Sequence, residues 1–471
     1  MTDAVTERYI EQCLDQGSRL RHAVADAAFG QRYLECFGDR LMPRPFFVPE
    51  AEIRQAADDL TGLFRVLLSL PERLFHGDLA AYCATVGFDC RQLGLMRRLA
   101  GAPPELYGRS DLYHDGDGFK LLEFNVGSQL GGIDQSQVMP ALLRVPAFGD
   151  FAAEHRLGYV HTGQQIARSL RAAAAQVGAA DAPVVALLEA DGALRSLMPL
   201  MLSFQEMLAE SGIDLRLGEV SQVVNKGGKL YLDGSPIDVV LRYFSAKQVA
   251  ADPAGMSSVE PILHAHEAGG TVLLTTLESL LYASKGCLAI LSDPYWRPAF
   301  TRGEQELFDR VLPWTRLVVD AETDAAGDAV KLLDYCRAHR EELILKPCDD
   351  HGGRGITVGW MVDDRDWADA LDSAVSEKYV VQERVRQRLE PVVDPATGRL
   401  QDWVACWSTF LTPVGYSGAH IRALPADQLG IINRGANAAT RLTGVFHTPV
   451  DQAPSVPAGL PVTDQGQEAI R

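Results

Sequence analysis

The sequence predicts a mixed α/β protein, and three observations lead to that prediction. Residues 1–104 carry apolar side chains at the three- and four-residue spacing of helices. Between residues 158 and 280, short apolar runs such as 184–189 and 238–244 alternate with helical stretches, which is typical of a parallel α/β layer. From residue 285 to residue 450, further strand-like runs surround a glycine-rich loop.

The composition limits the class of protein. Of the 471 residues, 47% are apolar and 23% are charged, as in globular proteins with a core. The net charge of −18 argues against a broad surface for nucleic acid or anionic membranes, because both need a basic face. The N-terminus lacks the layout of a secretory signal, and the apolar stretch 271–291 is interrupted by Glu278 and Lys285. With eight cysteines and no C-x-x-C pair, we expect a cytoplasmic protein with reduced thiols.

A hairpin with polar side chains is predicted from residue 109 to residue 126. The turn 115–118 reads Asp-Gly-Asp-Gly between two strand-like runs. Strand side chains alternate, so Arg109 shares a face with Asp111, and Glu123 shares a face with Asn125. Two carboxylates and an amide oxygen suit Mg²⁺, and the arginine suits a phosphate or a carboxylate. The alternative is a surface hairpin with a cross-strand ion pair of little energetic value.

A lysine and a glycine loop form the second candidate element. The run 342–347 is an apolar strand that carries Lys346 near its end, and the loop that follows contains Gly352, Gly353 and Gly355. Bare backbone N–H groups in such a loop approach phosphate oxygens closely. The loop leads into a second predicted strand at residues 356–362. Taken alone, the pattern also fits an exposed hairpin turn with an incidental lysine.

The combination of these elements resembles the circularly permuted branch of the ATP-grasp superfamily of carboxylate–amine ligases, and in particular the synthase domain of glutathionylspermidine synthase. R-x-D and L-E-x-N stand near residue 110, well before the glycine loop. The resemblance extends over residues 105–450. It implies an ATP-grasp fold with permuted order, a pre-ATP-grasp α/β domain and an N-terminal helical region.

The resemblance also assigns roles to individual residues. Lys285, in the stretch Tyr-Ala-Ser-Lys, and Lys346 are similar to the family's two nucleotide-binding lysines. The flap over the triphosphate, the hinge strand at the adenine and ribose, and two late elements near the γ-phosphate follow in a consistent order. The flap residues are Gly352, Gly353, Arg354 and Gly355, and the hinge-strand residues are Gln382, Glu383 and Val385. The two late elements contain Arg422 and Asn433.

Each assignment has a plainer alternative. Lys285 fits a helix surface, and Gln382 with Glu383 fits a polar strand edge. Arg422 fits a pair with a surface acid, and Asn433 fits a turn. Five elements in one consistent order favour the family assignment.

The implied activity is ligation of a small-molecule carboxylate to a small-molecule amine. ATP converts the carboxylate to an acylphosphate, the amine displaces phosphate, and ADP is released. Mg²⁺, in two copies, is expected on Asp111, Glu123 and Asn125, while Arg109, Arg422 and Asn433 are the expected catalytic residues. The alternatives are a phosphotransferase on the same fold and a non-catalytic nucleotide-binding protein. A homodimer is the default expectation.

Two further expectations concern organisation and charge. Asp349 and Asp350 bring negative charge to the glycine loop, which metal or Arg354 would have to offset. Arg242 and Glu189 end predicted strands of the open sheet, where ligand-facing residues often lie. The expected divisions are a helical region 1–104, a permuted segment 105–150, a pre-ATP-grasp α/β domain 151–280, a first grasp lobe 281–390, a second lobe 391–450 and a mobile tail 451–471.

Overall fold

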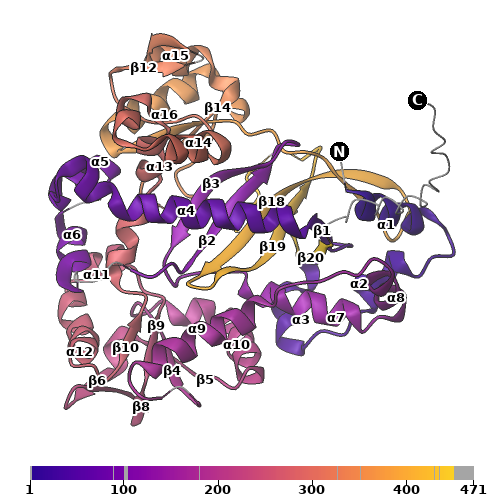
Figure 1. Cartoon of the computed structure of the whole chain (residues 1–471), viewed down its shortest axis with the longest axis horizontal. Coiled ribbons are helices and arrows are strands. Elements are labelled where there is room, and N and C mark those ends of the chain that lie inside the picture. Colours follow the sequence, from indigo (N-terminus) through magenta and orange to yellow (C-terminus); the bar gives the residue numbers. More distant parts are fainter. Residues whose placement is uncertain are drawn as a thin grey trace, which may run out of the picture.

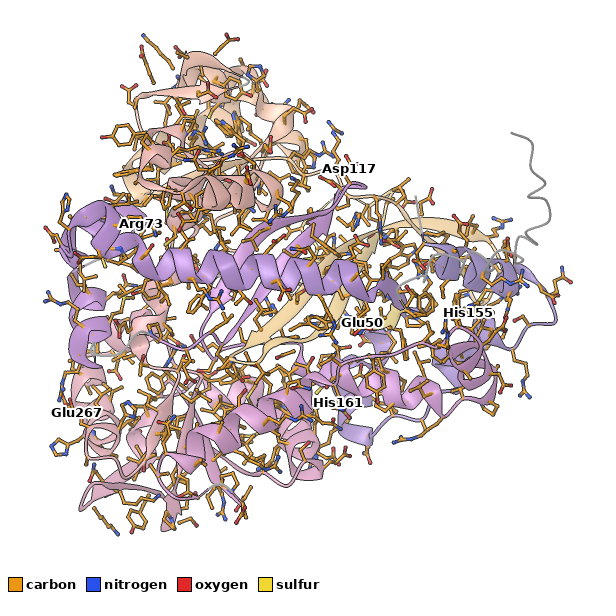
Figure 2. All side chains as sticks on the ribbon, in the orientation of Figure 1. Glu50, Arg73, Asp117, His155, His161 and Glu267 are labelled. Carbon is orange, nitrogen blue, oxygen red and sulfur yellow. The ribbon has the colours of Figure 1, made fainter. Side chains whose placement is uncertain are left out.

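A long helix crosses the front of the molecule and links its parts. The computed structural model describes residues 3–449, apart from 89, 100–103, 180, 326, 351, 429 and 434, so the predicted tail lies outside the described residues. Helix α4 (Glu50–Phe75) passes in front of a central sheet, and Glu50 and Arg73 mark its two ends (Figures 1 and 2). Its buried side chains, including Ile53, Leu60 and Leu67, recur at helical spacing and face the core.

The central sheet joins strands from both ends of the chain. Its order is β1-β20-β19-β18-β2-β3, and β17 pairs with β18. The predicted hairpin is confirmed, with Arg109 opposite Asn125 and Asp111 opposite Glu123. The strands are β1 (Phe46–Pro49), β2 (Gly108–His114), β3 (Phe119–Val126), β17 (Glu390–Val393), β18 (Leu400–Thr412), β19 (Gly415–Pro425) and β20 (Arg441–Thr448).

The sequence predicted a helical region from residue 1 to residue 104, but this region also contains a strand. Strand β1 runs parallel to β20, with Phe46 opposite Val445. A four-residue strand carries no usable periodicity, and its partner lies at the far end of the chain. The helices of this region and of the segment after the hairpin are α1 (Ala4–Leu14), α2 (Ala23–Asp26), α3 (Gln31–Phe37), α5 (Leu79–Val86), α6 (Cys90–Met96), α7 (Val138–Leu143) and α8 (Pro146–Glu154).

The predicted parallel layer is confirmed. Strands β10 (Val272–Leu274), β9 (Val239–Arg242), β4 (Val184–Glu189) and β5 (Asp214–Glu219) form a parallel sheet in that order. It lies at the bottom of Figure 1 with its helices, and a small antiparallel sheet is built on a hairpin at residues 223–232. The other elements here are α9 (Thr162–Ala175), α10 (Leu194–Glu210), α11 (Ala246–Ala251), α12 (Gly255–Glu267), β6 (Val223–Lys226), β7 (Lys229–Leu232) and β8 (Ser235–Ile237).

The part at the top of Figure 1 holds another four-stranded sheet, in the order β11-β16-β14-β15, and the two-stranded sheet β12-β13. The predicted strand at residues 356–362 is mostly wrong. Only Thr357 and Val358 form a strand, and a 3-10 turn follows at Gly359–Met361, where the backbone packs so closely on the carbonyl oxygen of Arg340 that a Cβ on Gly359 would clash with it. The elements are β11 (Thr315–Leu317), β12 (Glu322–Ala325), β13 (Asp328–Lys331), β14 (Leu343–Pro347), β15 (Thr357–Val358), β16 (Tyr379–Glu383), α13 (Lys285–Ser292), α14 (Arg302–Val311), α15 (Leu332–Ala338) and α16 (Asp364–Glu377).

None of the helices within the described residues combines the length and the apolar character that crossing a bilayer requires.

Candidate active site

A cavity of about 730 Å³ lies where the hairpin, the glycine loop and α13 meet. Fourteen of the fifteen predicted site residues line it, although they come from segments spread over the chain. Gly355 is the exception: a Cβ there would lie 2.8 Å from Cγ of Pro347, so this glycine serves close packing under the loop. The lining residues are Arg109, Asp111, Glu123, Asn125, Lys285, Lys346, Gly352, Gly353, Arg354, Gln382, Glu383, Val385, Arg422 and Asn433.

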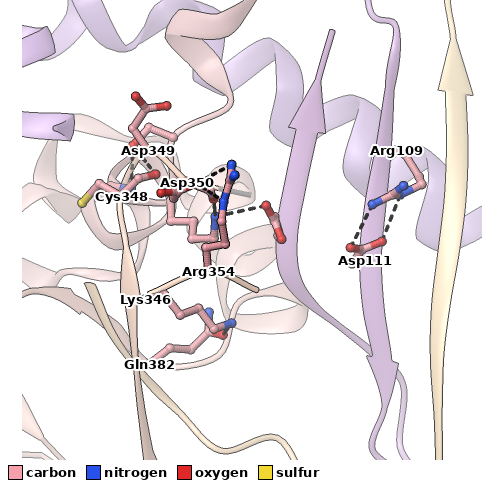
Figure 3. Close-up of polar contacts among 12 residues, drawn as sticks. Arg109, Asp111, Lys346, Cys348, Asp349, Asp350, Arg354 and Gln382 are labelled. Carbon is pink, nitrogen blue, oxygen red and sulfur yellow. Dashed lines mark hydrogen bonds and ion pairs between the residues drawn. The ribbon is translucent and has the colours of Figure 1, made fainter. Parts of the chain in front are cut away.

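Asp111 is held between two arginines. Its Oδ1 accepts hydrogen bonds from Nε of Arg109 at 3.1 Å and from the hydroxyl of Ser408 at 3.0 Å. Its Oδ2 accepts from Nη2 of Arg109 at 3.2 Å and lies 2.7 Å from Nη2 of Arg422 (Figure 3 shows the Arg109 pair). Burial raises the pKa of Asp111, but the charges of Arg109 and Arg422 outweigh burial, and the pKa is lowered overall.

Glu123 faces a buried lysine. Nζ of Lys285 donates to Oε1 of Glu123 at 3.0 Å and to the carbonyl oxygen of Asp350 at 2.7 Å. The side chains are 5% and 20% exposed for Lys285 and Glu123. Asn125 follows Glu123 on the same face of β3, and its buried amide nitrogen has no hydrogen-bond partner among the described residues. The hairpin therefore presents a polar row to the lysine.

The start of α13 fixes where Lys285 lies. Ser284 caps this helix by accepting a hydrogen bond from the Gly286 N–H at 3.0 Å, and its hydroxyl donates to the carbonyl oxygen of Val86. A Cβ on Gly286 would lie 2.8 Å from Cα of Val86, so only glycine permits this approach of α13 to the end of α5. The Lys285 N–H donates to the carbonyl oxygen of Cys348, which ties the helix to the glycine loop.

Lys346 is fully buried beside the hinge strand. Its Nζ donates to Oε1 of Gln382 at 2.6 Å, and the Gln382 amide donates to the hydroxyl of Thr315 at 3.1 Å. Burial lowers the pKa of Lys346 to about 8, with partial compensation by the charge of Glu123. Gln382 thus orients the lysine toward the cavity, as Figure 3 shows.

The rim of the cavity contains residues that the sequence analysis missed. The guanidinium of Arg384 lies over the ring of Trp360 at 4.1 Å, and both residues line the cavity. An aromatic side chain just after a glycine loop was the available signal. Glu383 accepts a hydrogen bond from the Trp314 N–H at 2.8 Å, so its carboxylate braces the strand edge.

The acidic pair in the glycine loop is compensated by neighbouring groups. Asp350 lies 3.1 Å from Nη2 of Arg354 and 3.5 Å from Nζ of Lys247, and Gln92 donates to Asp349 at 2.7 Å. Gln92 and Lys247 also line the cavity, and no motif in the sequence identified them. The offset expected from Arg354 is therefore present.

Arg242 and Glu189 do not line this cavity. Arg242 is fully buried and donates to the carbonyl oxygens of Thr275 and Phe244 at 2.8 and 2.6 Å. Its contacts hold two loops together at the end of the parallel sheet. Glu189 is buried as well, and burial raises its pKa to about 7.

The hairpin is suited to a divalent cation. The described residues contain no group of three or more His, Cys, Asp or Glu side chains placed to hold a metal ion. The cross-strand positions instead supply two carboxylates and one amide, which are hard oxygen donors of the kind Mg²⁺ prefers. The unpartnered amide nitrogen of Asn125 is a hydrogen-bond donor, so it suits an acceptor such as a phosphate oxygen and not the cation itself.

Comparison with known proteins supports the fold. No family model and no curated protein sequence matches the chain. Its structure resembles that of a glutathione synthetase-like effector from Globodera pallida in the apo form, with a TM-score of 0.53 and 13% identity over 95% of this chain and 99% of the other.

Two further solved structures are less similar. One is a provisionally named gamma-glutamylcysteine synthetase of Methylobacillus flagellatus KT, with a TM-score of 0.43 and 15% identity over 80% of this chain and 87% of the other. The other is a D-alanyl-alanine synthetase A of Vibrio cholerae, with a TM-score of 0.27 and 12% identity over 57% and 89%. The chain thus shares its mixed α/β fold with the glutathione synthetase-like effector.

Proposed function

We propose that this protein is an ATP-dependent ligase that joins a carboxylate to an amine through an acylphosphate and releases ADP and phosphate. The observation that carries the proposal is the gathering of Arg109, Arg422, Lys285 and Lys346 around the Asp111 and Glu123 carboxylates in one cavity. The shared fold supports it, and so does the order of the central sheet, in which β18 lies between β2, with Arg109 and Asp111, and β19, with Arg422.

The proposed roles follow from charge and position. Lys346 and Lys285 neutralise nucleotide phosphates, and Gln382 keeps the Lys346 ammonium directed into the cavity. Arg109 and Arg422, oriented by Asp111, stabilise the negative charge on the acylphosphate and on the tetrahedral oxyanion. Mg²⁺, which Glu123, Asn125 and Asp111 would hold, supplies further charge neutralisation for the phosphates. The protein thus contributes positioning and electrostatic stabilisation rather than covalent chemistry.

The buried thiol of Cys406 is not activated as a nucleophile. Cys406 lines the cavity, but burial raises the pKa of its thiol to about 11, against a partly opposing effect of Arg422. Since the thiol stays protonated near neutral pH, activation of the carboxylate by ATP is the chemistry that the charged groups favour.

The test is nucleotide product analysis with ATP, Mg²⁺, a panel of amino acids and short peptides, and hydroxylamine as a trap. ADP together with a hydroxamate supports carboxylate activation and identifies the acyl donor. AMP contradicts the proposal, whereas ADP with a stable phosphorylated product favours the phosphotransferase. Glu123→Ala should abolish turnover with an unchanged circular dichroism spectrum, and more than about a tenth of the wild-type rate, or about 1.4 kcal/mol, would contradict the role of Glu123.

A further inference from the structure

In this structure a protein ammonium lies on the carboxylate that the proposed function assigns to a divalent cation. Nζ of Lys285 is 3.0 Å from Oε1 of Glu123, and the pair is largely screened from solvent. The backbone of Lys285 is anchored by the cap of α13, by the contact with Val86 and by the bond to Cys348. The lysine is therefore held in reach of Glu123 and is not a chance surface contact.

The second carboxylate of the hairpin is also neutralised. All four hydrogen bonds that we describe for Asp111 come from Arg109, Arg422 and Ser408, which corresponds to the acceptor capacity of a carboxylate. A divalent cation that arrives alone meets a protein cation already bound to each carboxylate. The carboxylates of the proposed metal site are thus paired with protein cations even without a metal.

The charge balance of the cavity also disfavours the binding of a lone divalent cation. The lining carries seven cationic side chains and five carboxylates, although the chain as a whole has a net charge of −18. The cations are Arg109, Lys247, Lys285, Lys346, Arg354, Arg384 and Arg422, and the acids are Asp111, Glu123, Asp349, Asp350 and Glu383. Such a cavity attracts polyphosphate and disfavours a lone divalent cation.

We propose that Lys285 takes the place of the cation on Glu123 in the nucleotide-free protein, so that the divalent cation and the nucleotide phosphates bind as a coupled pair. A phosphate group gives the Lys285 ammonium a new partner, which releases Glu123 to the cation. By thermodynamic linkage each ligand then strengthens the binding of the other. This inference rests on the proposed function, because it takes Glu123 as a cation ligand.

The test measures Mn²⁺ binding to the full chain without nucleotide, from the electron paramagnetic resonance signal of free Mn²⁺. Lys285→Met should bind Mn²⁺ more tightly than the wild type, by a factor on the order of 5 to 150, the range of typical coupling between two ligands. Lys285→Arg keeps the positive charge on Glu123 and should remain as weak as the wild type. Glu123→Gln in the Lys285→Met background should abolish the gain, which locates the cation on Glu123.

Lys247→Met is the matched control, because it removes a lysine from the same cavity that pairs with Asp350 instead of Glu123. An equal gain in Mn²⁺ affinity in this variant would mean that the net charge of the cavity causes the effect, and it would overturn the proposal. No gain in Lys285→Met, checked for folding by circular dichroism and repeated with Lys285→Gln, would overturn it too. A different result would contradict the ligase proposal: the wild-type protein would form no ADP with any donor.

Discussion

Asp111→Asn tests whether the arginine pair depends on one buried carboxylate. The side chain of Asp111 is 10% exposed and accepts from two guanidiniums and a hydroxyl. The asparagine has the same shape but no charge, and in either orientation its amide group places N–H donors against a donor of Arg109 or Arg422. Breaking a buried ion pair by removing one partner costs about 3–5 kcal/mol. We expect a loss near the lower end, because the asparagine keeps one acceptor oxygen.

The assay is urea unfolding followed by fluorescence, combined with a pH series. The lowered pKa of Asp111 means that its stabilising contribution is complete above the unfolded value of about 3.9 and is lost as the pH falls through the lower folded value. The variant should therefore lose stability at neutral pH and show a shallower fall in stability below about pH 4. Asp117→Asn, in the exposed turn of the same hairpin (Figure 2), should leave the urea midpoint unchanged. A loss below about 1 kcal/mol with an unaltered acid limb would refute the reasoning, because one net hydrogen bond alone is worth that much.

Three other predictions concern the nucleotide end, the core and the base of the site. Because burial lowers the pKa of Lys346 to about 8, ATP affinity measured by calorimetry should decline as the pH rises above 8. Lys346→Ala should weaken ATP binding at pH 7 and remove the pH dependence. An unchanged ATP affinity in this variant would contradict the role of the loop. Glu390→Gln leaves the buried Arg44 and Arg388 without their shared carboxylate, so the urea midpoint should fall with a loss of about 3–5 kcal/mol, and a near-neutral result would show that the pair is dispensable. Gly286→Ala should push α13 away from Val86 and weaken nucleotide binding in the same calorimetric assay while the circular dichroism spectrum is retained; wild-type affinity would mean that Lys285 tolerates the shift.

Local signals predicted much of the fold. The Asp-Gly turn identified the hairpin, and strand alternation put Arg109 with Asp111 and Glu123 with Asn125; the structure adds the register, in which Asp111 lies opposite Glu123. The alternating pattern from residue 158 identified the parallel sheet. These elements were accessible because their structure depends on neighbours in the sequence.

What the sequence could not predict depends on distant partners. Strand β1 is defined by β20, and the contact between Lys285 and Glu123 joins residues that no spacing rule relates. Ser408, on β18, donates a further hydrogen bond to Asp111. The motifs thus indicated which residues gather in the cavity, but not that the cations and carboxylates would already be paired with one another.

The central sheet has a consequence for biosynthesis. Strands β1 and β2 pair with β20 and β18, which are synthesised much later. Until then, the apolar faces of β1 and of the early hairpin lack their partners, and contacts this distant in sequence form slowly. We expect the parallel sheet, whose strands are close together in the chain, to fold early in synthesis, and the cavity to assemble only once β18 and β19 have emerged from the ribosome. C-terminal truncations that remove β20 should accordingly yield aggregation-prone chains rather than merely inactive ones.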